Sequence, residues 1–134
     1  MASIHQSLTI TASVAEVWDA IRDFGRVHLR VAPGFVADCR LDGDGRIVTF
    51  ASGTIVRETL VDCDDSRHRL VYAISPNERV AHYQGQFVVT ENDDRRCRID
   101  WTVDLLPDAI APMIAAQMQL GVAAMRTTLE RSDG

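Results

Sequence analysis

The chain contains no lysine, and all 14 of its basic residues are arginines. Without an amine side chain it can perform neither Schiff-base chemistry nor the phosphate binding of a P-loop lysine. Acidic residues number 19, so the formal net charge is −5. This balance provides no global basic surface for a nucleic acid or an anionic membrane, and we predict neither as a partner.

Cysteine is also scarce, with Cys39, Cys63 and Cys97 in 134 residues and no Cys-x-x-Cys motif. An odd number at wide spacing argues against a disulfide framework and against a structural zinc site. The four histidines form none of the common metal-binding patterns, and no glycine-rich nucleotide motif is present. We therefore predict no metal and no other cofactor.

Long hydrophobic runs are absent too. No stretch approaches the about 18 apolar residues of a membrane helix, and the N-terminus lacks the pattern of a secretory signal. The sequence predicts a single cytoplasmic domain over residues 1–134, long enough to bury a core. It leaves open whether this domain is a monomer or a homodimer.

Seven segments are predicted to be strands, most clearly where apolar and polar residues alternate. In one of them the alternation places Cys39 and Leu41 on one face, and Val36 and Asp38 on the other. Turn-forming residues separate the segments, which favours an antiparallel meander. The segments cover residues 4–10, 35–41, 46–51, 54–62, 69–75, 80–90 and 96–106.

Helical spacing occurs near the start and at the end of the chain. A helix is predicted over 14–22, because Ser13 and Glu16 form a capping box before an apolar face. A short second turn follows over 26–30, and a long helix with an apolar stripe covers about 107–129. The order of elements predicts an α+β fold, with the long helix packed on one face of the sheet.

Several short phrases, taken in order, resemble the START/birch-pollen-allergen-like (SRPBCC) superfamily of the polyketide cyclase/dehydrase type. They are residues 13–18, 45–50 and 57–60, followed by Tyr83 and Trp101. The middle stretch is most similar to the branch of lachrymatory-factor synthase and the abscisic-acid receptors. The resemblance implies a helix-grip fold, in which a curved seven-stranded antiparallel sheet wraps around the C-terminal helix and encloses a cavity.

Arg46 and Glu58 are the most informative charged residues. If a three-residue loop at 51–53 closes their hairpin, the two residues lie opposite each other on the face of Val48 and Val56. Both charges then point into the cavity, where each needs the other. A two-residue loop would shift the register by one, and a solvent-facing ion pair would stabilise the fold little. The resemblance implies that these positions carry chemistry.

Tyr72 and Tyr83 are the two tyrosines, and both are predicted on the core side of their strands. There a phenol can bind a ligand oxygen or act as an acid, or it can simply be a satisfied core residue. Gly85 leaves the same face without a side chain, which would enlarge the cavity or mark a bend.

The predicted wall of the cavity is apolar. Trp101 and the methionines of the last helix suit ordinary core packing as well as a ligand surface. The ligand-binding residues are predicted to be Phe50, Val56, Tyr72, Ile74, Phe87, Trp101, Met118 and Val122.

These features suit the binding of a small hydrophobic or amphipathic molecule, such as a lipid, an isoprenoid or an aromatic polyketide. The alternative is a cofactor-free cyclase, dehydratase or isomerase. In that enzyme Glu58 carries a proton, while Arg46 and Tyr83 stabilise an oxyanion. A third alternative is an interaction domain whose cavity is too small for any ligand.

Overall fold

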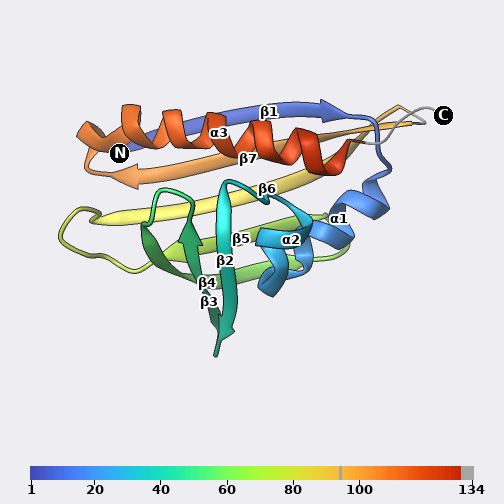
Figure 1. Ribbon diagram of the computed structural model, residues 1–134. Helices are drawn as coiled ribbons and strands as arrows, with labels where there is room; N and C mark the ends of the chain where they lie inside the picture. The colour runs from blue at the N-terminus through green and yellow to red at the C-terminus, as the bar shows by residue number, and fades with distance from the viewer. Residues whose placement is uncertain (94, 131–134) are drawn as a thin grey trace.

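The computed structural model describes residues 1–93 and 95–130, and it has the predicted α+β architecture. One seven-stranded antiparallel sheet has the order β1-β7-β6-β5-β4-β3-β2, and the long helix α3 lies along one face of it (Figure 1). The elements are β1 (Ala2–Ile10), α1 (Val14–Arg22), the 3-10 turn η1 (Phe24–Arg26), α2 (Val27–Arg30), β2 (Val36–Asp42), β3 (Gly45–Phe50), β4 (Ile55–Asp64), β5 (Arg69–Ile74), β6 (His82–Asp93), β7 (Arg96–Leu106), the 3-10 turn η2 (Asp108–Ile110) and α3 (Ala111–Leu129).

The sheet is strongly twisted. In Figure 1, β1, β6 and β7 run across the molecule, whereas β2 and β3 run in a clearly different direction, steeply crossing that of the others. The sheet and α3 therefore form a grip, with α1 and α2 beside one end of it. Within the described residues, no helix is both long and apolar enough to cross a membrane.

Helix α1 begins where the capping box predicts. The Ser13 hydroxyl accepts a hydrogen bond from the Glu16 backbone N–H at 3.1 Å, which satisfies one of the free donors of the first turn. The helix buries Val17, Trp18 and Ile21. The Trp18 indole N–H donates to the Asp65 carboxylate at 2.9 Å, which ties the helix to the turn after β4.

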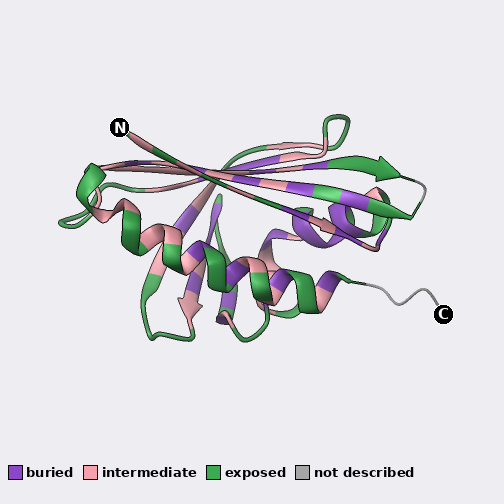
Figure 2. Cartoon of the chain, turned by 90° about the horizontal axis from the view of Figure 1, so that it is seen from above, coloured by how far each residue is buried: buried purple, intermediate pink, exposed green. Residues whose placement is uncertain are grey.

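Strand β7 confirms the predicted alternation. Its odd-numbered residues from Cys97 to Leu105 are buried beneath α3, while its even-numbered residues are partly or fully exposed. Figure 2 shows buried, partly buried and exposed positions interleaved along α3, as expected for a helix with one face on a core.

The alternation predicted for 35–41 holds from Asp38 to Leu41 but is wrong at Val36. The pairing of β2 with β3 shifts register between Val36 and Asp38, so one extra residue is inserted into β2. This bulge places Val36 and Cys39 on the same buried face, although they are three residues apart. Leu41 pairs with Arg46 and keeps the face of Cys39, as predicted, but near the end of the strand it is 66% exposed.

Candidate ligand-binding cavity

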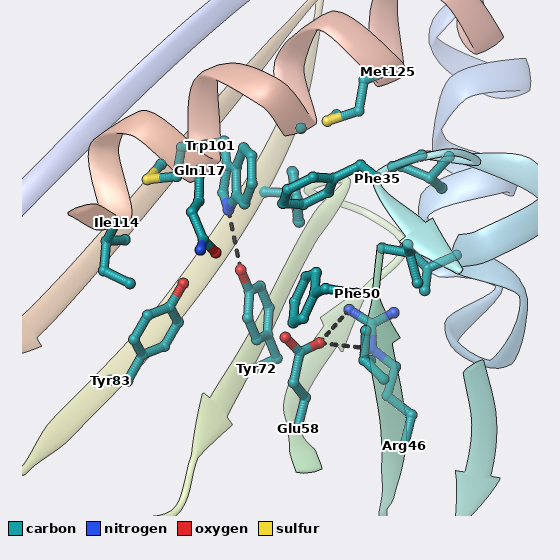
Figure 3. A pocket seen from close by; sticks show the side chains of 18 residues that line it. Phe35, Arg46, Phe50, Glu58, Tyr72, Tyr83, Trp101, Ile114, Gln117 and Met125 are labelled. Atoms are coloured by element: carbon teal, nitrogen blue, oxygen red, sulfur yellow. Dashed lines mark hydrogen bonds and ion pairs between the residues drawn. The ribbon is translucent and has the colours of Figure 1, made fainter. Parts of the chain in front are cut away.

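A cavity of about 70 Å³ lies between the sheet and α3 (Figure 3). Its walls are mainly aliphatic and aromatic side chains, with a few polar groups among them. Residues predicted for the site that line it are Arg46, Phe50, Glu58, Tyr72, Tyr83, Phe87, Trp101 and Met118.

The hairpin of β3 and β4 has the register that a three-residue loop predicts. Arg46 pairs with Glu58, and Val48 pairs with Val56. The Phe50 backbone N–H donates to the Thr54 carbonyl at 2.8 Å and closes the loop. Residues directly opposite each other share a face of the sheet, so both charged side chains reach the cavity.

Arg46 is held on three sides. Its Nε and Nη2 atoms lie 2.8 and 2.7 Å from Glu58 Oε1, and its Nη1 donates to the Phe24 carbonyl at 3.0 Å. The guanidinium carbon lies 3.9 Å from the centroid of the Phe24 ring, a cation–π contact. Arg46 and Glu58 are only 5% and 6% exposed, so this is a buried ion pair.

The two carboxylate oxygens of Glu58 have different surroundings. Both contacts from Arg46 fall on Oε1, whereas Oε2 forms no hydrogen bond with any described residue. Figure 3 shows this second oxygen turned away from Arg46. Oε2 is therefore available to accept a proton or a hydrogen bond from a bound molecule.

Aromatic side chains from β5, β6 and β7 form the other end of the cavity, which adjoins the ion pair: the Tyr72 ring centroid lies 5.7 Å from the Arg46 guanidinium carbon. The Trp101 indole N–H donates to the Tyr72 hydroxyl oxygen at 3.1 Å. Phe87 stacks between these two rings, with centroids 5.0 Å from Trp101 and 6.1 Å from Tyr72. The Tyr83 ring lies 6.5 Å from that of Tyr72, and its hydroxyl points into the same space (Figure 3).

Both phenols are held in the protonated form. Burial raises the pKa of Tyr72 well above its ordinary value, and the neighbouring Tyr83 and Glu58 raise it further. Burial and the Glu58 charge likewise raise the pKa of Tyr83, against an opposing hydrogen bond with Tyr72. At neutral pH the cavity therefore offers hydroxyl donors at this end.

Gly85 has a different role from either one predicted. It pairs with Tyr72 across β5 and β6 in an uninterrupted register, so it marks no bulge. The space above it holds the Tyr72 ring, because a Cβ at Gly85 would lie 2.2 Å from Tyr72 Cζ. Gly85 leaves room for the Tyr72 ring, which fills the space above it, so the glycine does not enlarge the cavity.

Three residues predicted to bind ligand lie outside the cavity wall. Val56 lies on β4 two residues before Glu58, and Ile74 pairs with Glu58 from β5, but neither is part of the lining. Val122 is partly buried against the core, on the flank of α3 about 100° from Gly121. The cavity therefore contacts fewer residues of the sheet and of α3 than the inward-facing positions of the sequence pattern predict.

The sequence missed the wall formed by α2 and the segment after it. The apolar residues of this segment follow no helical or strand pattern for more than one turn, although Val27 and Val31 are spaced one helical turn apart. The residues it contributes to the cavity are Val27, Val31, Ala32, Phe35 and Val36.

A second hollow of about 350 Å³ lies outside the cavity, beside the loop between β3 and β4. Phe35, Phe50 and Gln117 line both spaces. The rings of Phe35 and Phe50 meet edge to face, with centroids 5.3 Å apart. These three side chains therefore stand between the inner cavity and the outer hollow.

Other reactive side chains do not extend the site. Within residues 1–93 and 95–130, no group of three or more His, Cys, Asp or Glu side chains is arranged to hold a metal ion. The three cysteines are free, with Cys39 and Cys97 buried, and burial raises the pKa of the Cys97 thiol to about 11.

Comparison with known proteins covers nearly the whole chain. The family described as polyketide cyclase / dehydrase and lipid transport matches residues 1–130. No curated protein matches the chain in sequence.

Solved structures share the fold at low sequence identity. An uncharacterised protein from Bacillus thuringiensis is 19% identical with a TM-score of 0.84, and the match covers 96% of this chain and 98% of that one. A norcoclaurine synthase mutant from Thalictrum flavum, in complex with a transition-state analogue, is 19% identical with a TM-score of 0.74, covering 96% and 93%. The di-domain ARO/CYC protein BexL of the BE-7585A biosynthetic pathway is 11% identical with a TM-score of 0.80, covering 96% of this chain and 46% of that one.

Proposed function

Because the chain belongs to the polyketide cyclase/dehydrase and lipid transport family, we propose that it binds a small hydrophobic or amphipathic molecule between its sheet and α3. Membership in this family supports a ligand-binding or cyclase role. The observation that carries the proposal is an apolar cavity with a few polar groups in its wall. Binding sites for small molecules generally have this composition. The branch within the family stays a prediction.

The shape of the cavity favours a ligand with an apolar body and an oxygen function. The body would rest against Phe87, Trp101 and Met118, while the polar groups of the ligand would meet the ion pair or the phenols. A lipid, an isoprenoid or an aromatic polyketide-like compound has this character.

Size limits the ligand more strongly than polarity does. Pockets for drug-sized ligands measure roughly 300–1,000 Å³, whereas the inner cavity measures about 70 Å³. The outer hollow of about 350 Å³ would join it if Phe35 and Phe50 rotated apart. We infer that larger ligands bind with these rings displaced. If the rings could not move, the inner cavity would be too small for such a ligand, as in an interaction domain.

Native mass spectrometry of the purified protein tests this function, followed by extraction and identification of any bound molecule. We expect the folded chain to carry an extra small mass that is lost under denaturing conditions. The matched control is Ile114→Trp, in which a larger side chain fills the inner cavity and should exclude the molecule. A wild-type protein that is empty, and that also binds no fatty acid, isoprenoid or aromatic ketone, would contradict the proposal.

A second function, a cofactor-free cyclase, dehydratase or isomerase, is favoured by the two oxygens of Glu58. Arg46 engages Oε1 twice and leaves Oε2 free. In this function Oε2 takes a proton from a carbon beside a ligand carbonyl and returns it to another atom of the same ligand, or to a departing hydroxyl group. The first route gives an isomer and the second releases water, so no external oxidant is needed. Arg46 and Tyr83 would stabilise the oxyanion formed in between.

Replacement of Glu58 by Gln distinguishes the two functions, because the amide keeps the shape but cannot take up the proton. For an enzyme, turnover of the extracted ligand should fall by about 10²–10⁴-fold while its affinity changes little. The control is Asp104→Asn, an acidic residue on the outward face of β7. Unchanged turnover in Glu58→Gln would contradict the catalytic role and leave the binding role standing.

A further inference from the structure

Three polar hydrogens meet at the aromatic end of the cavity: the indole N–H of Trp101 and the hydroxyl hydrogens of Tyr72 and Tyr83. An indole N–H can only donate, and that of Trp101 donates to the Tyr72 oxygen at 3.1 Å. Tyr72 and Trp101 are 3% and 7% exposed. The hydroxyl hydrogen of Tyr72 must therefore point away from Trp101.

Trp101, Tyr72 and Tyr83 together have more polar hydrogens to donate than they can accept among themselves. If Tyr72 donates to Tyr83, the hydroxyl hydrogen of Tyr83 is left over; otherwise both hydroxyl hydrogens are. Outside the three residues, no described residue accepts a hydrogen bond from either hydroxyl. Tyr83 is only partly buried, and a hydroxyl hydrogen that faces the cavity without a protein acceptor is complementary to an acceptor on a ligand.

Two glycines fix the position of the rings. A Cβ at Gly85 would lie 2.2 Å from Tyr72 Cζ, and one at Gly121 would lie 3.0 Å from Trp101 Cζ3. Each ring of the hydrogen-bonded pair thus lies against a glycine, one on β6 and one on α3. Larger residues at either site would separate the Trp101 donor from its Tyr72 acceptor.

We propose that the ligand carries a ketone, aldehyde or enolate oxygen and that this oxygen accepts a hydrogen bond from the Tyr72–Tyr83 pair. Trp101 is a positioning residue, because its N–H occupies the Tyr72 oxygen and leaves the pair as a donor. Gly85 and Gly121 position the two rings. The inference rests on the proposed function, since it names the ligand class for the same cavity.

Two probes of closely similar shape test this inference, acetophenone labelled with ¹³C at its carbonyl and ethylbenzene. Each is titrated into the wild type and into the double variant Tyr72→Phe/Tyr83→Phe by NMR, with circular dichroism to verify folding. The ¹³C carbonyl resonance of acetophenone bound to the wild type should lie downfield of that bound to the double variant, and the Trp101 indole N–H resonance of the wild type should shift on binding. In the double variant, the affinity for acetophenone relative to ethylbenzene should fall by about 3- to 10-fold.

A second variant tests the positioning role of Trp101. Trp101→Phe keeps an aromatic ring but removes the N–H. We expect it to reduce the carbonyl shift and to lower the acetophenone-to-ethylbenzene affinity ratio by about 2- to 3-fold, a change that loss of packing alone would not produce because it affects both probes.

The outcomes separate the inference from the function it rests on. If both probes bind but the bound carbonyl resonance is the same in the wild type and the double variant, or if the affinity ratio is the same in both, the cavity binds ligands but the inference is overturned. If neither probe binds the wild type, the proposed function fails and the inference fails with it. Should the double variant not fold, the same comparison with the single variant Tyr83→Phe decides the outcome.

Discussion

The two ends of the cavity satisfy their buried polar groups in opposite ways. At the end formed by β3 and β4, Arg46 and Glu58 neutralise each other, and the Phe24 carbonyl takes a further N–H. At the end formed by β5, β6 and β7 there is no charge, and the Trp101–Tyr72 hydrogen bond leaves a hydroxyl hydrogen without an acceptor.

This difference follows from what burial costs each group. An unpaired charge in a protein interior is far more unfavourable than an unpaired hydroxyl, so the charged end must be nearly complete before any ligand arrives. Among the described residues, Glu58 Oε2 and two of the five guanidinium N–H groups of Arg46 are left without a partner there. A neutral hydroxyl can remain without a partner at a modest cost, so the aromatic end can be kept ready for a ligand.

The charged end should show the largest response to mutation. Arg46→Met leaves the Glu58 carboxylate buried without its partner, and we expect it to lower the free energy of unfolding by about 3–5 kcal/mol. Urea unfolding followed by circular dichroism measures the change.

The matched control is the double variant Arg46→Met/Glu58→Leu, which removes both charges. It should recover much of the lost stability, because an apolar pair of similar volume needs no desolvated charge. If the double variant is as unstable as the sum of its single variants, the two residues are not an interdependent buried pair.

At the aromatic end, a smaller loss should come from Gly85→Ala. The new Cβ would lie 2.2 Å from Tyr72 Cζ, so the ring must move and the Trp101 hydrogen bond must lengthen. We expect a loss of about 1–3 kcal/mol in the free energy of unfolding, typical of overpacking.

A double-mutant cycle with Tyr72→Ala tests whether contact with the Tyr72 ring causes that loss. In the Tyr72→Ala background, Gly85→Ala should be nearly neutral, since no ring remains above it. Equal losses in both backgrounds would show that the loss of unfolding free energy in Gly85→Ala comes from backbone effects at this position and not from contact with the Tyr72 ring.

The two ends also differ in how far the sequence predicted them. Arg46 and Glu58 are 12 residues apart in one hairpin, and the length of its loop was sufficient to set them opposite each other. Short-range geometry of this kind is encoded locally. The contact between Tyr72 and Trp101 spans 29 residues and depends on the exact packing of β5, β6, β7 and α3.

Local irregularity explains the remaining errors. The bulge between Val36 and Asp38 has no signature in the alternation, so the inward position of Val36 was not predicted. Alternation also assigns a face to a residue without saying whether a cavity or a neighbouring side chain fills the space there. For this reason the pattern predicted the inner face of Gly85 but not the Tyr72 ring that lies on it.

The smallest effect predicted for the aromatic end appears at alkaline pH. Both tyrosines of the chain line the cavity, and burial raises the pKa of each above the ordinary value of 10. Below about pH 10 both phenols are protonated in the folded and the unfolded chain, so their contribution to stability is complete. At higher pH the unfolded phenols ionise first, so the free energy of unfolding should fall by about 1.4 kcal/mol per pH unit for each tyrosine, until the folded phenols ionise too.

Tyr83→Phe isolates this effect, because it removes one phenol and leaves the acceptor of Trp101 in place. Between about pH 10 and pH 11, the free energy of unfolding of this variant should fall about 1 kcal/mol less than that of the wild type. The buried thiols, whose pKa values are also raised, contribute equally to both proteins and cancel in the difference. Ultraviolet absorbance gives an independent check: phenolate appearing in the folded wild type at about pH 10 would mean that the aromatic end is open to water, and the contrast between the two ends would disappear.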